Sequence, residues 1–473
     1  MLFGSELFLF RFLPALLILY FLTYLFPSAG RMRNVVLFAG SLLFFGWGEP
    51  VCVLLFLTAA LLAYLSGLLI EQFRESWASR VLLFLSVSLN LAVLGFFRYS
   101  HRRLNTTGSA GGDRFMISLL YVGIAFYILQ LISYTVDIYR GKVKAQRNLL
   151  DFGVFAVLFP QLVAGPVVRY KEIREQLHDR PMDAERISYG SRRFCVGLAK
   201  KVLLADQLGL LWMEVLGRQD RLSVLLAWLG LAAFSLVIYF ALSGYADMAI
   251  GLGAVLGFHF PENFKYPYLS VSVTEFWHKW FVTLGRWMRD YVYIPLGGNR
   301  KGLIRQNLNI LVVWLFTGSW YGDGWNFLLW GLWYALFLML EKALAPKKRK
   351  TFWNLPGFLY TQVVVLIGWA IFAISNPAQL WRYLAALFGF GAAGLYDAAA
   401  LFLLREYAVL LVLALVAATP LGFLLADRMK KSGSSVVIVL RRFLEKLLPA
   451  VLLLASVAYI VGGSGNLLWY FGH

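Results

Sequence analysis

Aromatic and charged side chains alternate in one stretch of an otherwise apolar chain, residues 261–330. Within it, Trp277, Trp280 and Trp287 follow one another at roughly helical spacing, and His278 comes directly after the first of them. Polar side chains are costly in apolar surroundings, so those that occur there are candidates for chemistry. Histidine suits general acid–base catalysis because its unperturbed pKa lies near physiological pH.

Two structures fit the spacing of these tryptophans. One is an amphipathic helix at a membrane interface, with the indole rings at the level of the headgroups and Arg and Lys side chains reaching to water. The other is a helix that lines a polar cavity. Spacing alone favours the interfacial helix, and only the cavity helix would bring His278 to a reaction.

The elements that must position these residues are membrane-spanning helices. Hydrophobic residues make up 60% of the 473 residues and charged residues only 15%, whereas a soluble domain is about half apolar and a quarter charged. Long runs without charge recur along the chain, and a helix needs about 20 residues to cross the hydrocarbon core. The sequence therefore predicts a polytopic all-α membrane bundle of about 11 spans.

The net charge of +19 is distributed in short basic clusters between the apolar runs. Examples are residues 347–350 and 428–431, and this pattern is typical of cytoplasmic loops. No basic face long enough to follow a duplex is present, so we expect no nucleic-acid binding. Three apolar runs separate these two clusters, one too many for both to face the cytoplasm. We therefore predict that the segment after Pro377, which contains Arg382, does not span the membrane.

Two further stretches depart from a simple series of spans. Residues 159–166 carry two prolines and a glycine inside an apolar run. Irregular backbone is tolerated at membrane depth only where protein or water satisfies it, so we predict a re-entrant segment. The longest polar stretch, residues 169–193, is predicted to be a cytoplasmic loop with a short amphipathic helix.

The cysteines and histidines do not predict a metal site. Cys52 and Cys195 both lie in apolar contexts, which favours small buried hydrophobic residues over a disulfide or metal ligands. The five histidines show no spacing typical of a zinc site.

Several separate motifs resemble those of the membrane-bound O-acyltransferase family, in its bacterial alginate O-acetyltransferase-like branch. They follow the order of that branch along nearly the whole chain: SYTVDIYRG at 133–141, FPQLVAGPVVRY at 159–170, GLAKKVLLAD at 197–206, SGYADMAIG at 243–251 and RDYVYIPLGGNR at 289–300.

The resemblance implies a fold and a reaction. The fold would be a single membrane domain over residues 1–473, with the motifs at approximately 115–345, in which spans and re-entrant segments surround a central tunnel. An acyl group, in this branch acetyl, would pass from acetyl-CoA or another acyl thioester to a hydroxyl of an exported polysaccharide or cell-envelope polymer. No bound cofactor is implied. The expected surroundings are membrane lipid, the cytoplasmic membrane and an extracytoplasmic partner protein.

The chain departs from the family at the positions that carry the chemistry. The family's catalytic histidine stands in a Trp-His-Gly motif, and the residue here is Tyr321; its second histidine aligns with Phe281. A phenol has a pKa near ~10 that burial raises, so Tyr321 would stay protonated and donate a hydrogen bond rather than act as a base. His278 lies three residues before Phe281, about one helical turn away, and is the candidate substitute.

Other polar and aromatic residues near these positions are candidates to line the tunnel or bind substrate. Asp323 and Asn326 are close enough in sequence to hydrogen-bond Tyr321, and Asp247 is either structural or tunnel-lining. Arg289 and Asp290 are neighbours that should point apart on a helix and pair elsewhere. The candidates besides Tyr321 and His278 are Trp320, Asp323, Asn326, Phe281, Trp277, Trp280, Asp247, Arg289 and Asp290.

Three functions remain open on the sequence. The first is an active O-acyltransferase with altered site residues. The second is a catalytically degenerate homologue that serves polysaccharide export as an assembly or transport partner, which Tyr321 and Phe281 favour. The third is an unrelated membrane transporter, supported only by the broken run at 159–166. Whether a base lies beside Tyr321 separates the first two.

Overall fold

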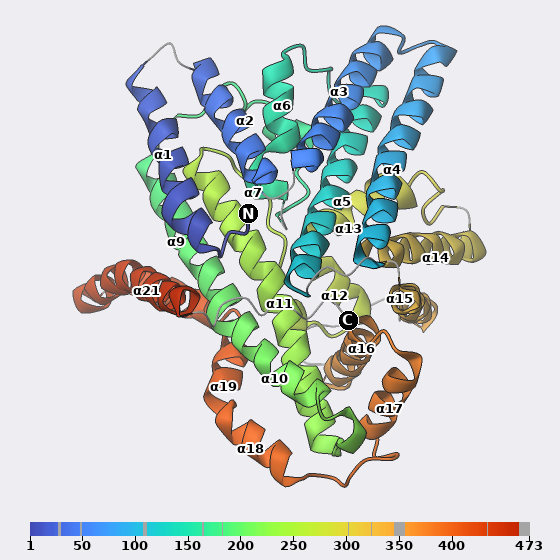
Figure 1. Ribbon diagram of the computed structural model, residues 1–473, viewed down its shortest axis with the longest axis vertical. Helices are drawn as coiled ribbons and strands as arrows, with labels where there is room; N and C mark the ends of the chain where they lie inside the picture. The colour runs from blue at the N-terminus through green and yellow to red at the C-terminus, as the bar shows by residue number, and fades with distance from the viewer. Residues whose placement is uncertain are drawn as a thin grey trace. The chain divides into compact units, whose positions relative to one another are not determined.

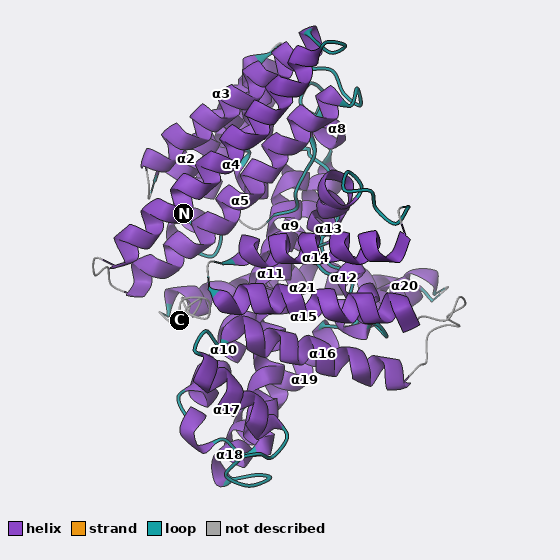
Figure 2. Ribbon diagram, turned by 90° about the vertical axis from the view of Figure 1, so that its right-hand side faces the viewer, coloured by secondary structure: helices purple, strands orange, loops and turns teal. Residues whose placement is uncertain are grey.

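The computed structural model describes residues 1–26, 30–47, 50–106, 111–162, 165–181, 183–300, 302–322, 324–344, 355–432 and 434–462. All regular structure in these residues is helical, and they contain no strand (Figure 2). The all-α fold class predicted from the composition is thus confirmed. The chain divides into two compact units, residues 1–198 with 245–262, and residues 199–244 with 263–473.

The first unit is built on antiparallel apolar helices, among which α3, α4 and α5 contact one another (Figure 1). Phe3, Phe8, Phe44 and Phe159 are fully or almost fully buried and form an aromatic core beneath them. The helices are α1 (Leu13–Leu22), α2 (Gly30–Gly46), α3 (Pro50–Gln72), α4 (Trp77–Thr106), α5 (Gly111–Tyr139), α6 (Leu149–Val157), α7 (Phe159–Leu162), α8 (Tyr170–Ile173) and α9 (Ala184–Ala199).

The second unit contains the motif-rich stretch, in which α14, α15 and α16 pack in sequence (Figure 2). The helix α11 contributes to both units, because the boundary falls inside it. The helices are α10 (Asp206–Leu216), α11 (Val224–Val255), α12 (Val273–Lys279), α13 (Val282–Met288), α14 (Gly302–Tyr321), α15 (Trp325–Leu344), α16 (Leu355–Ala373), α17 (Pro377–Leu387), α18 (Ala398–Glu406), α19 (Ala408–Ala417), α20 (Leu421–Lys431) and α21 (Ser435–Val461).

Seven helices of the described residues are long and apolar enough to cross a membrane, or eight if the bent pair α18 and α19 forms one span. The predicted number of about 11 spans is not confirmed, since several apolar runs became shorter or broken helices. The helix α17 has 11 residues and is about 16 Å long, too short to cross. This length agrees with the prediction that the segment after Pro377 does not span, while residues 347–350 lie outside the described residues.

The proline-containing run at 159–166 is held by protein groups. The helix α6 ends at Val157 and α7 covers only four residues. The backbone N–H of Phe159 donates to the hydroxyl of Ser41 over 3.1 Å, and the Gln161 amide donates to the carbonyl of Phe155 over 2.7 Å. These contacts satisfy backbone groups at the break between α6 and α7, while residues 163–164 of the run lie outside the described residues.

The predicted cytoplasmic loop at 169–193 is more helical than expected. It contains the short helix α8 and then the first half of α9, which continues beyond it to Ala199. Arg180 is buried within it, and its guanidinium donates to the side chain of Asn34.

A buried ion pair joins the π-helical turn Lys200–Ala205 to the start of α10. The ammonium of Lys201 lies 2.7 Å from the carboxylate of Asp206, and the two side chains are only 2% and 0% exposed. Removing one partner of such a pair leaves an uncompensated buried charge, whereas replacing both by apolar or neutral groups is often nearly neutral.

We predict that Lys201→Met lowers the free energy of unfolding by about 3–5 kcal/mol, because the carboxylate of Asp206 loses its counter-charge. Thermal unfolding of the purified protein in detergent measures the change. The double variant Lys201→Met/Asp206→Asn should recover most of the loss, and a double variant less stable than the single one would contradict this account.

Candidate active site

The stretch predicted as one amphipathic helix is two short helices with a break between them. The helix α12 ends at Lys279, and Phe281 takes a left-handed backbone conformation with φ of 44° before α13 begins. For a non-glycine residue this conformation costs about 1–2 kcal/mol. Two backbone hydrogen bonds hold the break, from Lys265 N–H to the carbonyl of Lys279 and from Val282 N–H to the carbonyl of Asn263.

This break corrects two expectations. His278 and Phe281 are not one turn apart on a single helix, because the helix stops between them. The interfacial alternative is also wrong for Trp280 and Trp287, whose side chains are 1% and 3% exposed and lie in the protein core.

Aromatic packing fixes α12 against its neighbours. The indole of Trp277 makes edge contacts with Trp314 of α14 and with Trp330 and Tyr334 of α15, at centroid distances of 4.7, 5.4 and 4.7 Å. Such pairs favour a single ring geometry and bury large areas. These contacts fix the position of Trp277, and therefore of the next residue, His278, relative to α14 and α15.

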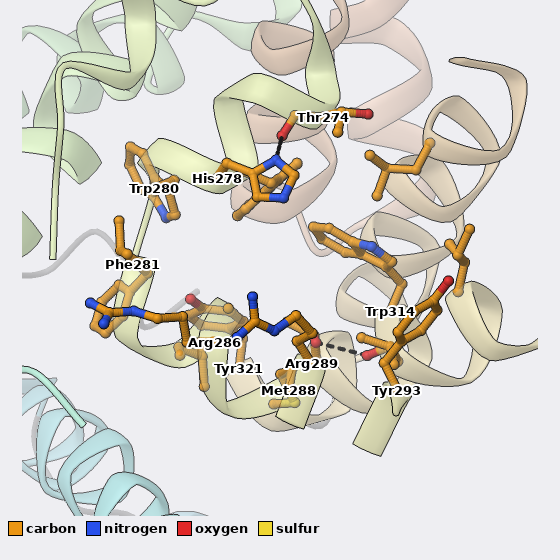
Figure 3. Close-up of a pocket in the computed structure, with 18 of the residues that line it drawn as sticks. Thr274, His278, Trp280, Phe281, Arg286, Met288, Arg289, Tyr293, Trp314 and Tyr321 are labelled. Carbon is orange, nitrogen blue, oxygen red and sulfur yellow. Dashed lines mark hydrogen bonds between the residues drawn. The ribbon is translucent and has the colours of Figure 1, made fainter. Parts of the chain in front are cut away.

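A pocket of about 350 Å³ opens beside this cluster, between α12, α13, α14 and α15 (Figure 3). Its walls are mostly apolar, with a few polar side chains from separate helices, which is the usual composition of a small-molecule site. Six of the predicted site residues line it, namely Tyr321, His278, Phe281, Trp277, Trp280 and Arg289.

The imidazole of His278 is exposed in this pocket and has a defined tautomer. Its Nδ1 lies 2.7 Å from the carbonyl oxygen of Thr274 (Figure 3). A carbonyl oxygen only accepts, so Nδ1 carries the proton and donates it. In the neutral ring Nε2 is then an acceptor, and Figure 3 shows this second nitrogen turned toward the open space. His278 is therefore oriented to accept a proton from a group in the pocket.

Tyr321 ends α14 and lines the same pocket. Its ring packs edge-on against Trp330 and Phe372, with centroids 5.4 and 5.8 Å apart. Burial raises the pKa of Tyr321 above its ordinary value. The hydroxyl consequently stays protonated and acts as a hydrogen-bond donor rather than a base.

Three basic side chains also line the pocket, Arg286, Arg289 and Lys342. The guanidinium of Arg289 extends into the space opposite His278 (Figure 3), and its Nε donates to Asp290 over 2.8 Å. Sequence reasoning missed Arg286 and Lys342. Arg286 stands directly before the Trp-Met-Arg-Asp run, but no spacing rule connects it with Lys342, which lies on another helix.

The remaining predicted residues lie outside the pocket. The Asn326 side chain is buried and donates to the carbonyl of Phe372 over 2.9 Å. Trp320 is buried against Phe316, and Asp247 belongs to the first unit, where it pairs with Arg193. Asp290 does not line the pocket, and its pairing with Arg289 over 2.8 Å corrects the prediction that these neighbours point apart and pair elsewhere. Asp323 falls outside the described residues.

No cluster of three or more His, Cys, Asp or Glu side chains that could hold a metal ion is found in the described residues. The pocket instead combines a proton acceptor, a phenolic donor and three cations around an apolar cavity. This set can deprotonate a hydroxyl and stabilise negative charge on an oxygen without a metal.

Comparison with known proteins identifies the family of the chain. Residues 38–376 match the model of MBOAT, the membrane-bound O-acyltransferase family. A probable alginate O-acetylase, AlgI, of Pseudomonas putida is 40% identical over 399 residues, which cover 83% of this chain and 81% of that protein. The peptidoglycan O-acetyltransferase of Helicobacter pylori is 30% identical over 82% of this chain and 80% of its own length.

A more distant relative is the teichoic acid D-alanyltransferase of Bacillus subtilis, 22% identical over 52% of this chain and 65% of that protein. All three relatives are named as acetylases or transferases that act on a polymer, namely alginate, peptidoglycan or teichoic acid. The family model covers well over half of the chain, and the apolar helices match a multi-pass protein of the cytoplasmic membrane. The chain therefore belongs to the membrane-bound O-acyltransferase family, as its motifs predicted.

Proposed function

We propose that this protein is an O-acyltransferase that moves an acetyl group from a thioester donor to a hydroxyl of an exported polysaccharide or cell-envelope polymer. Its family and its relatives among alginate and peptidoglycan acetyltransferases support the reaction class. The observation that carries the proposal for this chain is the shared pocket of Tyr321 and His278, with Nε2 of His278 available as an acceptor.

In the proposed reaction, Nε2 of His278 takes the proton of the acceptor hydroxyl as its oxygen attacks the thioester carbonyl carbon. The phenol of Tyr321 donates a hydrogen bond to the carbonyl oxygen, which becomes negative as the new C–O bond forms. The C–S bond then breaks, the ester is released, and the leaving thiolate recovers the proton from the imidazolium of His278. Atoms and charge balance without any bound cofactor.

The basic side chains suggest which end of the pocket receives the donor. Lys342 lies near the end of α15, five residues before the cluster at 347–350 that faces the cytoplasm by its charge. We propose that Arg286, Arg289 and Lys342 attract the phosphate groups of acetyl-CoA or another acyl thioester from that side. The acceptor polymer and an extracytoplasmic partner protein would approach from the opposite side, within the surrounding lipid.

One observation favours a second candidate, a catalytically degenerate homologue that assists polysaccharide export. Tyr321 occupies the position of the family's catalytic histidine, and a phenol is a poor base. The two candidates differ in one respect: only an active enzyme needs Nε2 of His278. Measurement of ester-linked acetate on the exported polymer, in a deletion strain complemented with each variant, separates them.

We predict that His278→Ala lowers acetyl transfer by about 10²–10⁴-fold, because the reaction loses its general base. Acetate released by mild alkali from the exported polymer measures the effect in cells, and thioester consumption by purified protein measures it directly. The variant Tyr321→His, which restores the family's residue, should return activity to the His278→Ala protein. If His278→Ala keeps full activity, another base operates; if the wild type transfers no acetate, the degenerate role is favoured.

We predict that Tyr321→Phe lowers kcat by about 10²–10³-fold, because the developing oxyanion loses one hydrogen-bond donor. Phenylalanine keeps the ring contacts with Trp330 and Phe372, so the melting temperature should change little. Single-turnover kinetics with a saturating acetyl thioester test this prediction. Unchanged kcat would exclude the phenolic hydroxyl from the reaction.

We predict that the double variant Arg286→Gln/Arg289→Gln raises the KM for an acetyl-CoA donor by about 100-fold or more, since each of two charge-assisted hydrogen bonds contributes about 1.5–3 kcal/mol. The increase should shrink for a short acetyl thioester that lacks phosphate. Arg382→Gln is the matched control, because its exposed guanidinium pairs with Asp220 outside the pocket. Equal losses with both donors would contradict phosphate recognition.

A further inference from the structure

One carboxylate of α15 has a role that the sequence did not indicate. Glu341 is 9% exposed and lies in a helix apolar enough to span a membrane. Ionisable side chains are rare in such helices and usually mark function when they face the protein interior. Glu341 is not among the residues that line the pocket.

The carboxylate of Glu341 accepts three hydrogen bonds from the first residues of α12. One oxygen accepts from the backbone N–H of Val273 over 2.7 Å, and the other from the backbone N–H and the hydroxyl of Thr274 over 2.9 and 2.6 Å. Hydrogen bonds to an ionised acceptor are about twice as strong as neutral ones. These contacts attach the start of α12 to α15.

Thr274 is also the residue that orients His278. Its N–H and hydroxyl donate to Glu341, and its carbonyl accepts the Nδ1 proton of His278 over 2.7 Å. Thr274 therefore links the carboxylate of Glu341 on α15 to the imidazole of His278 in the pocket. A displacement of Thr274 moves the acceptor that sets the tautomer and the direction of the ring.

The short helix α12 depends on this anchor. It has only seven residues, and an isolated helix of this length is not stable by itself. Ser272 already accepts the N–H of Glu275, so Glu341 supplies different hydrogen bonds, to Val273 and Thr274. At its other end α12 is held by the hydrogen bond between Lys279 and Lys265.

We infer that Glu341 is a positioning residue for the acyl-transfer reaction, which holds Thr274 so that Nε2 of His278 points at the acceptor hydroxyl. This inference rests on the proposed function of His278. Glu341 acts on the reaction through Thr274 and His278, because it touches neither substrate nor the reacting atoms.

The test is Glu341→Gln, which keeps the size of the side chain but replaces one acceptor oxygen by an NH₂ group. That group faces backbone N–H donors, so at least one hydrogen bond is lost. We expect kcat to fall about ten- to hundredfold, since a displacement of about 1 Å can have an effect of this size. The KM for the donor should stay unchanged. Glu214→Gln is the control, because Glu214 is exposed and pairs with Arg218.

Two further measurements separate positioning from a general loss of structure. In a His278→Ala background, Glu341→Gln should cause no additional loss, because there is no imidazole left to misdirect. Free imidazole added to His278→Ala should restore part of the activity, and equally so with Glu341→Gln present. A merely structural role would lower the rescued activity and the melting temperature together.

The outcomes distinguish this inference from the proposed function. Suppose that His278→Ala is inactive. If Glu341→Gln is then as active as wild type, or if its loss of activity adds to that of His278→Ala, the positioning role of Glu341 is overturned, while His278 remains the proposed base. If His278→Ala is fully active, the proposed base itself fails.

Discussion

The hydrogen-bonded break between α12 and α13 is the constraint on which the site depends. A continuous helix through residues 273–288 would place the tryptophans on one stripe and could supply only one wall of a cavity. Anchored by Asn263 and Lys265, the chain instead turns at Phe281, and the two short helices form two walls of one pocket. The left-handed conformation at Phe281 is tolerated because the buried ring packs against Phe264 and the flanking backbone is hydrogen-bonded to residues 263 and 265.

In the proposed mechanism two helices share the chemistry of the site. Tyr321 supplies a phenol from α14, while the imidazole of His278 on α12, with a defined tautomer, faces the same pocket. The proposal thus assigns proton acceptance to His278 and hydrogen-bond donation to the carbonyl to Tyr321. Glu341 and Thr274 fit this arrangement, since an imidazole on a seven-residue helix needs external support.

Much of the fold followed from pattern alone. Hydropathy predicted the helical membrane bundle, charge placement predicted that α17 does not span, and the prolines at 160 and 166 predicted a broken segment. The predicted number of spans is not confirmed, because apolar runs occur both in membrane spans and in buried short helices, and several runs form short helices in the described residues. The helix through Trp277–Trp287 was mispredicted because backbone contacts with residues 263–265, distant from the pattern, terminate it.

The sequence by itself determined the family and the fold class, because both are recorded in residue types and their order. Only the tertiary structure decided which polar residues share a cavity. It placed His278, Tyr321 and Arg289 together, directed Asn326 to a backbone carbonyl, and brought Lys342 and Glu341 next to α12 from a different helix. Such contacts depend on side-chain packing between distant segments, which periodicity along one segment does not encode.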